Sequence, residues 1–410
     1  MEKLSARQRL LVAVVMLTMA SETLDIAVPG IVYPRLIQEW GIPIAAVTVS
    51  VTAAGLAMAV GSAVGGPIAD RFNRRPVILL GVPLYGATTI LMGFATSIEM
   101  FTGLRLLAGL GLGAVMPVLL ASVAEGVPSG RRGAMVSLAF AGTGIGSIVA
   151  GLLASLVVPT AGWPTLLWVS GAIPLVLLPG LALLLPASPA TGPTTRDRAA
   201  VALVLGRPML VTTLLIWFCS LISAASVFLI LNYLPLVAER ADLGIARAAI
   251  LVAAFGWGGL VGQLVVSYAL QRIDRFRLLA ALFAVAAAAG WGIALLGPVF
   301  GPLVVLVAVL GFTLSGSGGA MYAVGALAYP PRARATGMGL GSSVGRLGGL
   351  TSGILGGVMI GAGWSAGAIF GALGLPLLAA GAAVLGLRAR RPAPEPTVEP
   401  VDRGTERPTS

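Results

Sequence analysis

The stretch SETLDIAVPGIVYP, residues 21–34, lies in the middle of the first long apolar run of the chain. It contains two carboxylates, Glu22 and Asp25, whose spacing places them on one face of a helix. The surrounding run, 10–32, is otherwise apolar enough to lie in a lipid bilayer. Because acids at membrane depth are costly, they usually serve proton relay or a substrate pathway. The alternative is that each acid stabilises the structure by pairing with a buried arginine.

The composition of the chain is typical of a membrane protein. Of its 410 residues, 57% are hydrophobic and 10% are charged, and the mean hydropathy is +0.99, which is too apolar for a soluble domain. The 56 glycines suit closely packed transmembrane helices, because small residues let backbones approach. The chain has no histidine, so proton chemistry near neutral pH must use carboxyl groups.

The apolar segments predict an all-α membrane protein with twelve transmembrane helices, since a spanning helix needs about 20 apolar residues. The segments lie at about 10–32, 44–68, 77–96, 100–123, 134–158, 164–185, 208–234, 247–268, 278–297, 302–326, 336–360 and 365–387. A polar stretch, 186–207, predicts a cytoplasmic linker between two six-helix halves, 10–185 and 208–387. Residues 1–9 predict a cytoplasmic N-terminus, and residues 388–410 a disordered cytoplasmic tail.

The placement of lysine and arginine predicts the topology. Of the 26 Lys and Arg residues, Arg35, Arg240 and Arg247 fall on loops assigned to the outside. Arg105 and Arg346 fall within spans, and the other 21 lie on the N-terminus, the even-numbered turns and the tail. Because cytoplasmic loops carry excess Lys and Arg, we expect both termini in the cytoplasm and a multi-pass protein of the bacterial inner membrane. Topology and lipid headgroup contacts also account for the net charge of +11 without a nucleic-acid partner.

The two halves resemble each other in sequence. GVPSGRRGAM at 126–135 aligns with YPPRARATGM at 329–338, at an offset of 203 residues. Two related six-helix halves are typical of transporters, whose binding site lies between the halves near the middle of the membrane. The repeat is broken at the ionisable positions, since Ala and Thr stand opposite Arg105 and Arg346. Function often enters where a regular pattern is broken.

The loop after the second span carries a charged motif, GPIADRFNRR at 66–75. It resembles the signature loop of the major facilitator superfamily, and the matching residues are Gly66, Asp70, Arg71, Arg74 and Arg75. The resemblance implies the major facilitator fold, with two pseudo-repeated six-helix halves. It also implies that the loop holds the outward-facing conformation and does not touch substrate. Alternatively, the loop is a plain positive-inside topology signal.

A larger part of the chain, from about 20 to 387, resembles the aromatic acid:proton symporter family of this superfamily. That family carries D-G-x-D in its first span, where this chain has Glu22 and Asp25 at the same spacing. Further matches are NYLP at 232–235 and GRLG at 345–348. The resemblance implies proton-driven uptake of a small aromatic carboxylate.

The two arginines within the predicted spans are candidate partners for the acids and for an anion. Arg105 lies in the outer half of the fourth span, at the depth where it can meet Asp25 and change how readily that acid takes a proton. Arg346 lies near the middle of the eleventh span, where a guanidinium can hold a carboxylate through two hydrogen bonds. Alternatively, Arg346 forms a structural pair with Glu22. We predict that Glu22, Asp25 and Arg105 couple protons and that Arg346 binds substrate.

An aromatic substrate also needs ring contacts and hydrogen bonds. Asn232, Tyr233, Trp257 and Tyr322 are the predicted substrate-binding residues. The alternative for the aromatic residues is an interfacial or packing role, and the alternative for Asn232 is a bond across helices. Further candidates for ring contacts or hydrogen bonds to the substrate are Trp217, Phe218, Gln263, Ser315 and Ser317.

These patterns lead to one functional hypothesis and two rivals. We predict a monomeric, proton-coupled symporter that imports a small organic anion. A drug or metabolite:proton antiporter is the first rival, but its usual Gly-Pro pair in the fifth span is Gly146-Ser147 in this chain, and Arg346 disfavours a cation. The second rival, a receptor or scaffold, would not need the membrane acids and arginines. The sequence shows no metal-ligand cluster, nucleotide loop or catalytic triad, so we expect no enzyme activity, metal or cofactor.

Overall fold

The structure is a computed structural model that describes residues 4–128, 131–185, 201–297, 299–330 and 334–389. Within these residues all regular secondary structure is helical. The N-terminal half contains α1 (Ala6–Trp40), α2 (Ile44–Phe72), α3 (Arg74–Met92), α4 (Ile98–Gly126), α5 (Arg132–Phe140) and α6 (Gly142–Leu184). The C-terminal half contains α8 (Arg207–Arg240), α9 (Gly244–Ala269), α10 (Arg275–Leu296), α11 (Phe300–Ala328), α12 (Arg334–Gly361), α13 (Ala366–Ala372) and α14 (Gly374–Ala389).

The helices provide twelve membrane spans. By length and composition, 11 helical stretches in the described residues can cross a membrane, and one of them, 132–184, is 53 residues long. One crossing needs only about 20 residues. This stretch contains α5 and α6 and turns back at Gly162, where φ is 79° and ψ is 169°, a conformation that favours glycine. It therefore crosses twice, and the predicted all-α fold with twelve transmembrane helices is confirmed. The chain is a multi-pass membrane protein.

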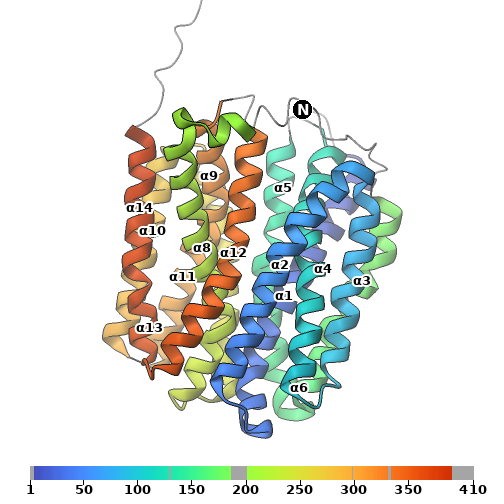
Figure 1. Ribbon diagram of the computed structural model, residues 1–410, viewed down its shortest axis with the longest axis vertical. Helices are drawn as coiled ribbons and strands as arrows, with labels where there is room; N and C mark the ends of the chain where they lie inside the picture. Colours follow the sequence, from blue (N-terminus) through green and yellow to red (C-terminus); the bar gives the residue numbers. More distant parts are fainter. Residues whose placement is uncertain (1–3, 129–130, 186–200, 298, 331–333, 390–410) are drawn as a thin grey trace, which may run out of the picture.

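The two halves lie side by side (Figure 1). Helices α1–α6 form one side of the molecule and α8–α14 the other, and the N-terminus lies at the same end as the last turn of α14. The predicted linker and tail fall largely outside the described residues. Within them, residues 201–205 are helical and α14 continues to Ala389.

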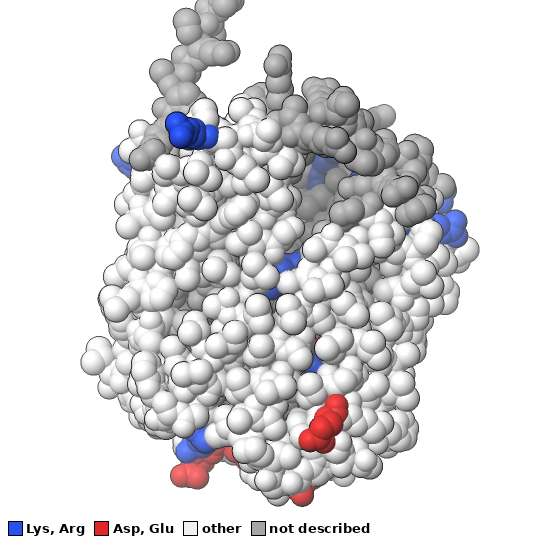
Figure 2. Space-filling model, viewed as in Figure 1, with Lys and Arg blue, Asp and Glu red and all other residues white. Residues whose placement is uncertain are grey.

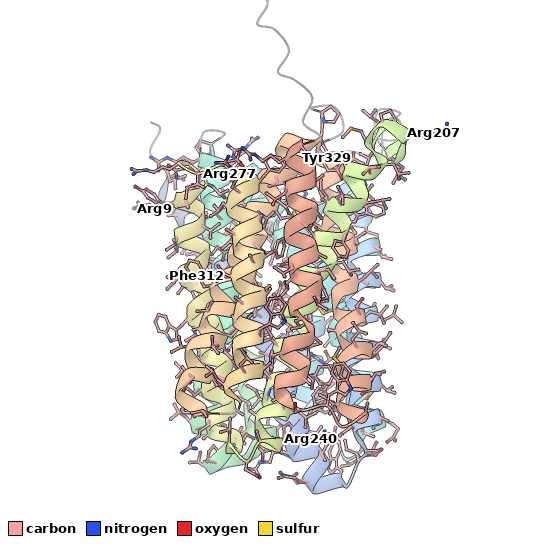
Figure 3. All side chains as sticks on the ribbon, turned by 90° about the vertical axis from the view of Figure 1, so that its left-hand side faces the viewer. Arg9, Arg207, Arg240, Arg277, Phe312 and Tyr329 are labelled. Carbon is pink, nitrogen blue, oxygen red and sulfur yellow. The ribbon has the colours of Figure 1, made fainter. Side chains whose placement is uncertain are left out.

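The two ends of the bundle differ in charge. The end that holds the N-terminus carries Arg9, Arg207 and Arg277 (Figure 3), and we call it the arginine-rich end. The opposite end is the acid-bearing end, whose acids are Glu39, Glu99, Glu239 and Asp242. On the face shown in Figure 2, acidic side chains gather at this end.

Toward the acid-bearing end, the two halves meet closely through glycines. A Cβ atom at Gly30 of α1 would lie 2.9 Å from Cα of Asn232 in α8. A Cβ atom at Gly353 of α12 would lie 2.8 Å from Cα of Thr52 in α2. Side-chain atoms do not approach backbone this closely, so both contacts require a residue without a side chain. The halves are therefore closed against each other at this end.

Replacing Gly30 with valine is expected to open the contact, because the new side chain would meet the backbone of α8. The measurement uses Thr52→Cys in a Cys219→Ser background, so that one thiol reports on the contact. Alkylation of this cysteine by a water-soluble maleimide in detergent should speed up on the order of tenfold, which corresponds to about 1.4 kcal/mol in the opening equilibrium.

The matched control is Gly103→Val in α4, because a Cβ atom at Gly103 would meet no atom of another helix within 4 Å. The control should leave the alkylation rate unchanged. Equal rates in the Gly30→Val and Gly103→Val proteins would show that Gly30 does not hold the halves together.

Candidate functional site

A cavity of about 290 Å³ lies between the two halves. Both halves contribute to its wall: α1, α2, α4, α5 and α6 on one side, and α8–α12 on the other. The wall residues of α12, 338–346, come from the part of that helix nearer the arginine-rich end, and those of α11, 314–325, do the same. The surface is hollowed between the halves toward this end (Figure 2). The cavity is therefore placed toward the arginine-rich end, away from the closed contact.

Most of the cavity wall is apolar, with a small polar part. Phenylalanines and methionines from both halves make up much of it: Phe140, Phe228, Phe255, Phe283, Met58, Met116, Met321 and Met338. A group of serines from α8 and α11 faces the same space: Ser220, Ser223, Ser315 and Ser317. A largely apolar pocket with a few convergent polar groups is typical of a small-molecule site.

Two ionisable residues face this cavity from opposite halves. Glu22 of α1 and Arg346 of α12 both line it, and their opposite charges attract each other. Glu22 is only 3% exposed, and its Oε1 accepts no hydrogen bond from any described residue. The structure thus brings one predicted proton-coupling residue and the predicted anion-binding residue to a single space.

Asp25 points elsewhere, although it is only three residues from Glu22. Its carboxylate accepts a hydrogen bond from Thr89 of α3 and lies 3.5 Å from Nη1 of Arg105 of α4, measured at Oδ2. It is 1% exposed and is not among the described residues that line the cavity. A spacing of three residues leaves two side chains about 60° apart around a helix. The predicted common face is therefore divided, with Glu22 toward the cavity and Asp25 toward α3 and α4.

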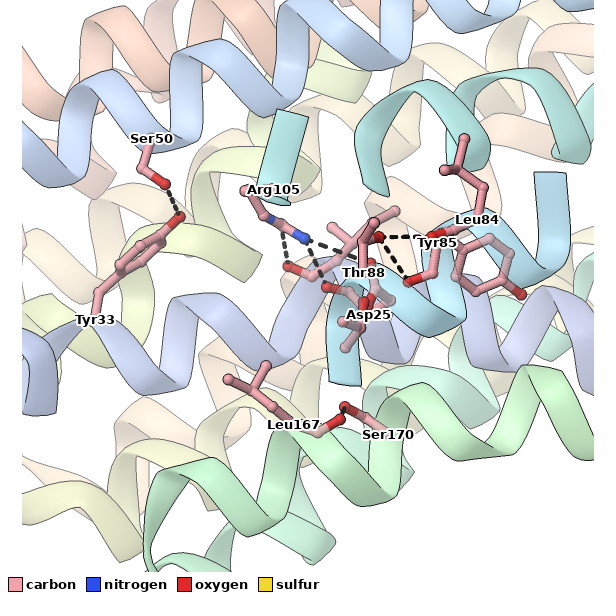
Figure 4. Close-up of polar contacts among 11 residues, drawn as sticks. Asp25, Tyr33, Ser50, Leu84, Tyr85, Thr88, Arg105, Leu167 and Ser170 are labelled. Carbon is pink, nitrogen blue, oxygen red and sulfur yellow. Dashed lines mark hydrogen bonds and ion pairs between the residues drawn. The ribbon is translucent and has the colours of Figure 1, made fainter. Parts of the chain in front are cut away.

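Arg105 also completes a hydrogen bond that α1 lacks (Figure 4). Its Nη1 donates to the backbone oxygen of Asp25 at 2.9 Å, and its Nη2 donates to that of Ile26 at 3.3 Å. In an unbroken helix, the donor to the Asp25 oxygen would be the N–H of residue 29. That residue is Pro29, which has no N–H. Arg105 therefore supplies the missing donor and ties this point of α1 to α4.

Sequence reasoning missed Thr89 and Pro29 as members of this site. Pro29 carried a readable signal, because it stands four residues after Asp25, the spacing of a helical hydrogen bond. Thr89 carried none, because it comes from another helix. Near these residues, Ser21 and Tyr85 form a further buried bond between α1 and α3, with their oxygens 2.8 Å apart.

Two predicted substrate-binding residues contribute to packing of α8 instead. The hydroxyl of Tyr233 donates to the backbone oxygen of Gly353 in α12 at 2.9 Å and is fully buried. The Nδ2 of Asn232 donates to the backbone oxygen of Phe228, one turn earlier, at 2.8 Å. Neither residue is among the described residues that line the cavity. Both lie where α8 meets the N-terminal half or α12, toward the acid-bearing end.

The aromatic residue predicted on α9, Trp257, gives no cavity contact either. Trp257 is 55% exposed on the surface of α9, while its neighbour Gly256 lines the cavity. Successive residues on a helix point about 100° apart, so Trp257 is turned outward. The side chain of Tyr322 lies outside the described part of the structure.

The charged loop motif lies at the arginine-rich end, away from the cavity. Arg74 forms an ion pair with Glu125 of α4 at 2.6 Å, and Nη2 of Arg75 donates to the backbone oxygen of Ala182 at 2.6 Å. Gly66 has open space around the position of a Cβ atom. The side chains of Asp70 and Arg71 lie outside the described part of the structure.

If Arg105 replaces the donor that Pro29 removed, then restoring that donor should make Arg105 less necessary. Arg105→Met should lower the midpoint of thermal unfolding, because it leaves a buried carbonyl and a buried carboxylate without their partner. Arg105→Met should also lower the free energy of unfolding. In a Pro29→Ala background this decrease should be smaller by about 1–3 kcal/mol, the cost of one unsatisfied buried group. The measurement is a double-mutant cycle on protein in detergent.

The matched background is Pro34→Ala, which removes the other proline within α1 but leaves the Asp25 carbonyl unchanged. There, the loss caused by Arg105→Met should equal that in the unmodified chain. The same loss in all three backgrounds would mean that Arg105 does not replace the donor that Pro29 removes.

Comparison with known proteins identifies the family. The model of the Major Facilitator Superfamily matches residues 15–328 and 216–410. The gallate transporter of Pseudomonas putida is 30% identical, over 93% of this chain and 92% of its own. The 4-hydroxybenzoate transporter PcaK of Pseudomonas aeruginosa is 29% identical, over 94% of this chain and 93% of its own. The 3-(3-hydroxy-phenyl)propionate transporter of Escherichia coli is 28% identical, over 96% of this chain and 98% of its own.

The fold is shared with a solved transporter. The crystal structure of a D-xylose-proton symporter superposes with a TM-score of 0.74 and 18% sequence identity, over 94% of this chain and 98% of that one. The family match over most of the chain and the common twelve-helix fold together show that this protein is a member of the Major Facilitator Superfamily.

Proposed function

We propose that this protein is a proton-coupled symporter that imports a small aromatic carboxylate by alternating access. The observation that carries the proposal is the pairing of Glu22 and Arg346 across one cavity between the halves. Relatives that match nearly the whole chain transport gallate, 4-hydroxybenzoate and 3-(3-hydroxy-phenyl)propionate, and each of these is an aromatic acid. The organic anion and protons are the small-molecule partners of this function, and no enzymatic step is part of it.

Arg346 holds the substrate carboxylate in this proposal. A guanidinium binds a carboxylate through two parallel hydrogen bonds, and the apolar wall of the cavity suits an aromatic ring. A volume of about 290 Å³ is at the small end of ligand pockets, which span roughly 300–1,000 Å³. A single-ring acid fits this description.

Glu22 and Asp25 carry the coupled protons. Glu22 is reached directly from the cavity, whereas Asp25 lies behind it beside Arg105. An anion that binds Arg346 weakens its attraction to Glu22, and a proton on Glu22 then removes a buried charge that has lost its partner. The loaded site therefore crosses the closed state with fewer unpaired charges when Glu22 carries a proton than it would without that proton.

The charge of the two ends supports the orientation. The arginine-rich end faces the cytoplasm, because cytoplasmic loops carry excess Lys and Arg. Because α1 begins and α14 ends at this end, we place both termini in the cytoplasm. The protein then belongs in the bacterial inner membrane, among its lipids, and acts as a monomer. In this orientation the cavity is placed toward the cytoplasm and the closed glycine contact lies on the outside.

An antiporter of drugs or metabolites is the competing function. A lipophilic cation would meet the positive charge of Arg346 in the cavity wall, which raises the cost of binding it. Ligand-induced thermal shifts separate the two functions: benzoate-like anions should raise the unfolding midpoint and tetraphenylphosphonium should not. The opposite pattern would favour the antiporter.

The coupling is tested by removing each acid. Asp25→Asn and Glu22→Gln should abolish accumulation of labelled 4-hydroxybenzoate against its gradient in proteoliposomes driven by a proton gradient. Exchange of labelled for unlabelled acid should survive, because it needs no net proton movement. Undiminished proton-driven accumulation in both variants would contradict the coupling role.

The substrate role of Arg346 is tested by binding. Arg346→Gln should weaken the binding of 4-hydroxybenzoate by about 10- to 100-fold, because hydrogen bonds to charged groups contribute about 1.5–3 kcal/mol. Arg35→Gln, at the acid-bearing end, is the matched control and should leave the affinity unchanged. An Arg346→Gln protein with normal affinity would show that the carboxylate binds elsewhere.

A further inference from the structure

Two serines in the cavity wall form a directed chain of hydrogen bonds. Ser317 of α11 donates its proton to the backbone oxygen of Leu314 at 2.7 Å. Its Oγ also lies 2.9 Å from Oγ of Ser223 in α8. A serine hydroxyl has one proton and two lone pairs. Geometry alone lets either hydroxyl donate in the bond between them. We assign Ser223 as its donor, because the single proton of Ser317 is placed on the shorter bond to Leu314.

Ser223 is therefore left as an acceptor. Its only proton points to Ser317, so the lone pairs of its oxygen are what it offers to a ligand in the cavity that it lines. Ser220 and Ser315 line the same cavity but hydrogen-bond to none of the described residues, so their hydroxyls turn to donate or accept as a ligand requires. Compared with Ser220 and Ser315, Ser223 has a hydroxyl whose direction is set by a neighbouring residue.

We propose that Ser223 selects aromatic acids that carry a hydrogen-bond donor on the ring. The inference rests on the proposed function, in which Arg346 holds the carboxylate in the same cavity. A ring hydroxyl or amino group extends the chain, donating to Ser223, which donates to Ser317, which donates to the Leu314 carbonyl. Bonds arranged head to tail in this way polarise and strengthen one another.

The same arrangement disfavours close analogues. An unsubstituted ring leaves the Ser223 oxygen against an apolar group, and a methoxy oxygen places an acceptor against an acceptor. In each case a buried polar atom loses the partner it had in water. A site built to hydrogen-bond a substrate group rejects the analogue without it for this reason. The apolar remainder of the wall, which includes Phe228 and Phe255, offers a methoxy oxygen little compensation.

The test compares direct binding of five acids by calorimetry on purified protein: benzoate, 3-hydroxybenzoate, 4-hydroxybenzoate, 4-aminobenzoate and 4-methoxybenzoate. The unmodified protein should bind at least one hydroxybenzoate, together with 4-aminobenzoate, about 3- to 10-fold more tightly than benzoate, the size of one net hydrogen bond. The methoxy acid should bind no better than benzoate. Ser223→Ala should bring all five affinities together, because the acids with a donor lose their bond while benzoate and the methoxy acid no longer leave the Ser223 oxygen without a partner.

The matched control is Ser226→Ala on the same helix. Ser226 is buried and donates to the backbone oxygen of Ile222 in its own helix at 2.8 Å, and it is not among the described residues that line the cavity. This variant should keep the preference for donors. Ser223→Thr, which retains a hydroxyl, should keep it as well.

Two results would overturn the proposal. One is an unchanged ratio of hydroxy- to methoxybenzoate affinity in Ser223→Ala. The other is equal affinity for these two acids in the unmodified protein, a measurement that needs no variant to fold. Normal benzoate binding with no donor preference removes only the role of Ser223, whereas binding of none of the five acids removes the proposed function together with it.

Discussion

The bond between Arg105 and the backbone oxygen of Asp25 is the contact on which the centre of this protein depends. Pro29 takes a donor away from α1, and Arg105 replaces it from α4. The guanidinium is itself a buried charge, which the membrane interior tolerates only with partners. Two backbone oxygens and the Asp25 carboxylate provide them. The interrupted helix and the buried charges thus stabilise each other. Removing one of these groups leaves the others buried without a hydrogen-bond partner or counter-charge.

This contact also gives the two acids, Glu22 and Asp25, different surroundings. Arg105 and Thr89 hold Asp25 against α3 and α4, while Glu22 is left facing the cavity. A change of charge on Asp25 acts on the same guanidinium that completes the backbone of α1. The next turn of α1 contains Gly30, where the halves meet. One helix therefore links the ionisable site to the contact that must open during alternating access.

The few polar groups of the mostly apolar cavity can orient a ligand. Its phenylalanines and methionines provide contact without orientation, and its few polar groups are placed where orientation matters. Arg346 is a donor, and Ser223 is an acceptor in the arrangement that we propose, in which Ser223 donates to Ser317 and Ser317 donates to the Leu314 carbonyl. A ligand with an acceptor at one end and a donor at the other satisfies both. Polarity of this kind discriminates more sharply than the shape of an apolar wall.

The sequence by itself determined the class, the number of spans and the family resemblance. Hydropathy fixes the class and the number of spans, because each span must satisfy its own backbone in lipid. The family resemblance can be read from the sequence because the loop motif at 66–75 is continuous in the chain. The sequence also singled out Glu22, Asp25, Arg105 and Arg346, because a charge at membrane depth is conspicuous wherever it points. It predicted that Arg105 can meet Asp25, since both lie at the same depth.

Only the tertiary structure decided which way these side chains point and what surrounds them. Asp25 turns from the cavity because Thr89, 64 residues away, and Arg105 lie behind α1. Tyr233 leaves the cavity to bond α12, 120 residues away. The apolar wall and Ser223 carry no local signal, because phenylalanine, methionine and serine are ordinary in a membrane helix, and the sequence could not show that Ser317 contacts Ser223. Spacing along one helix fixes the angle between two side chains, but the neighbour that each one meets is set by how separate helices pack.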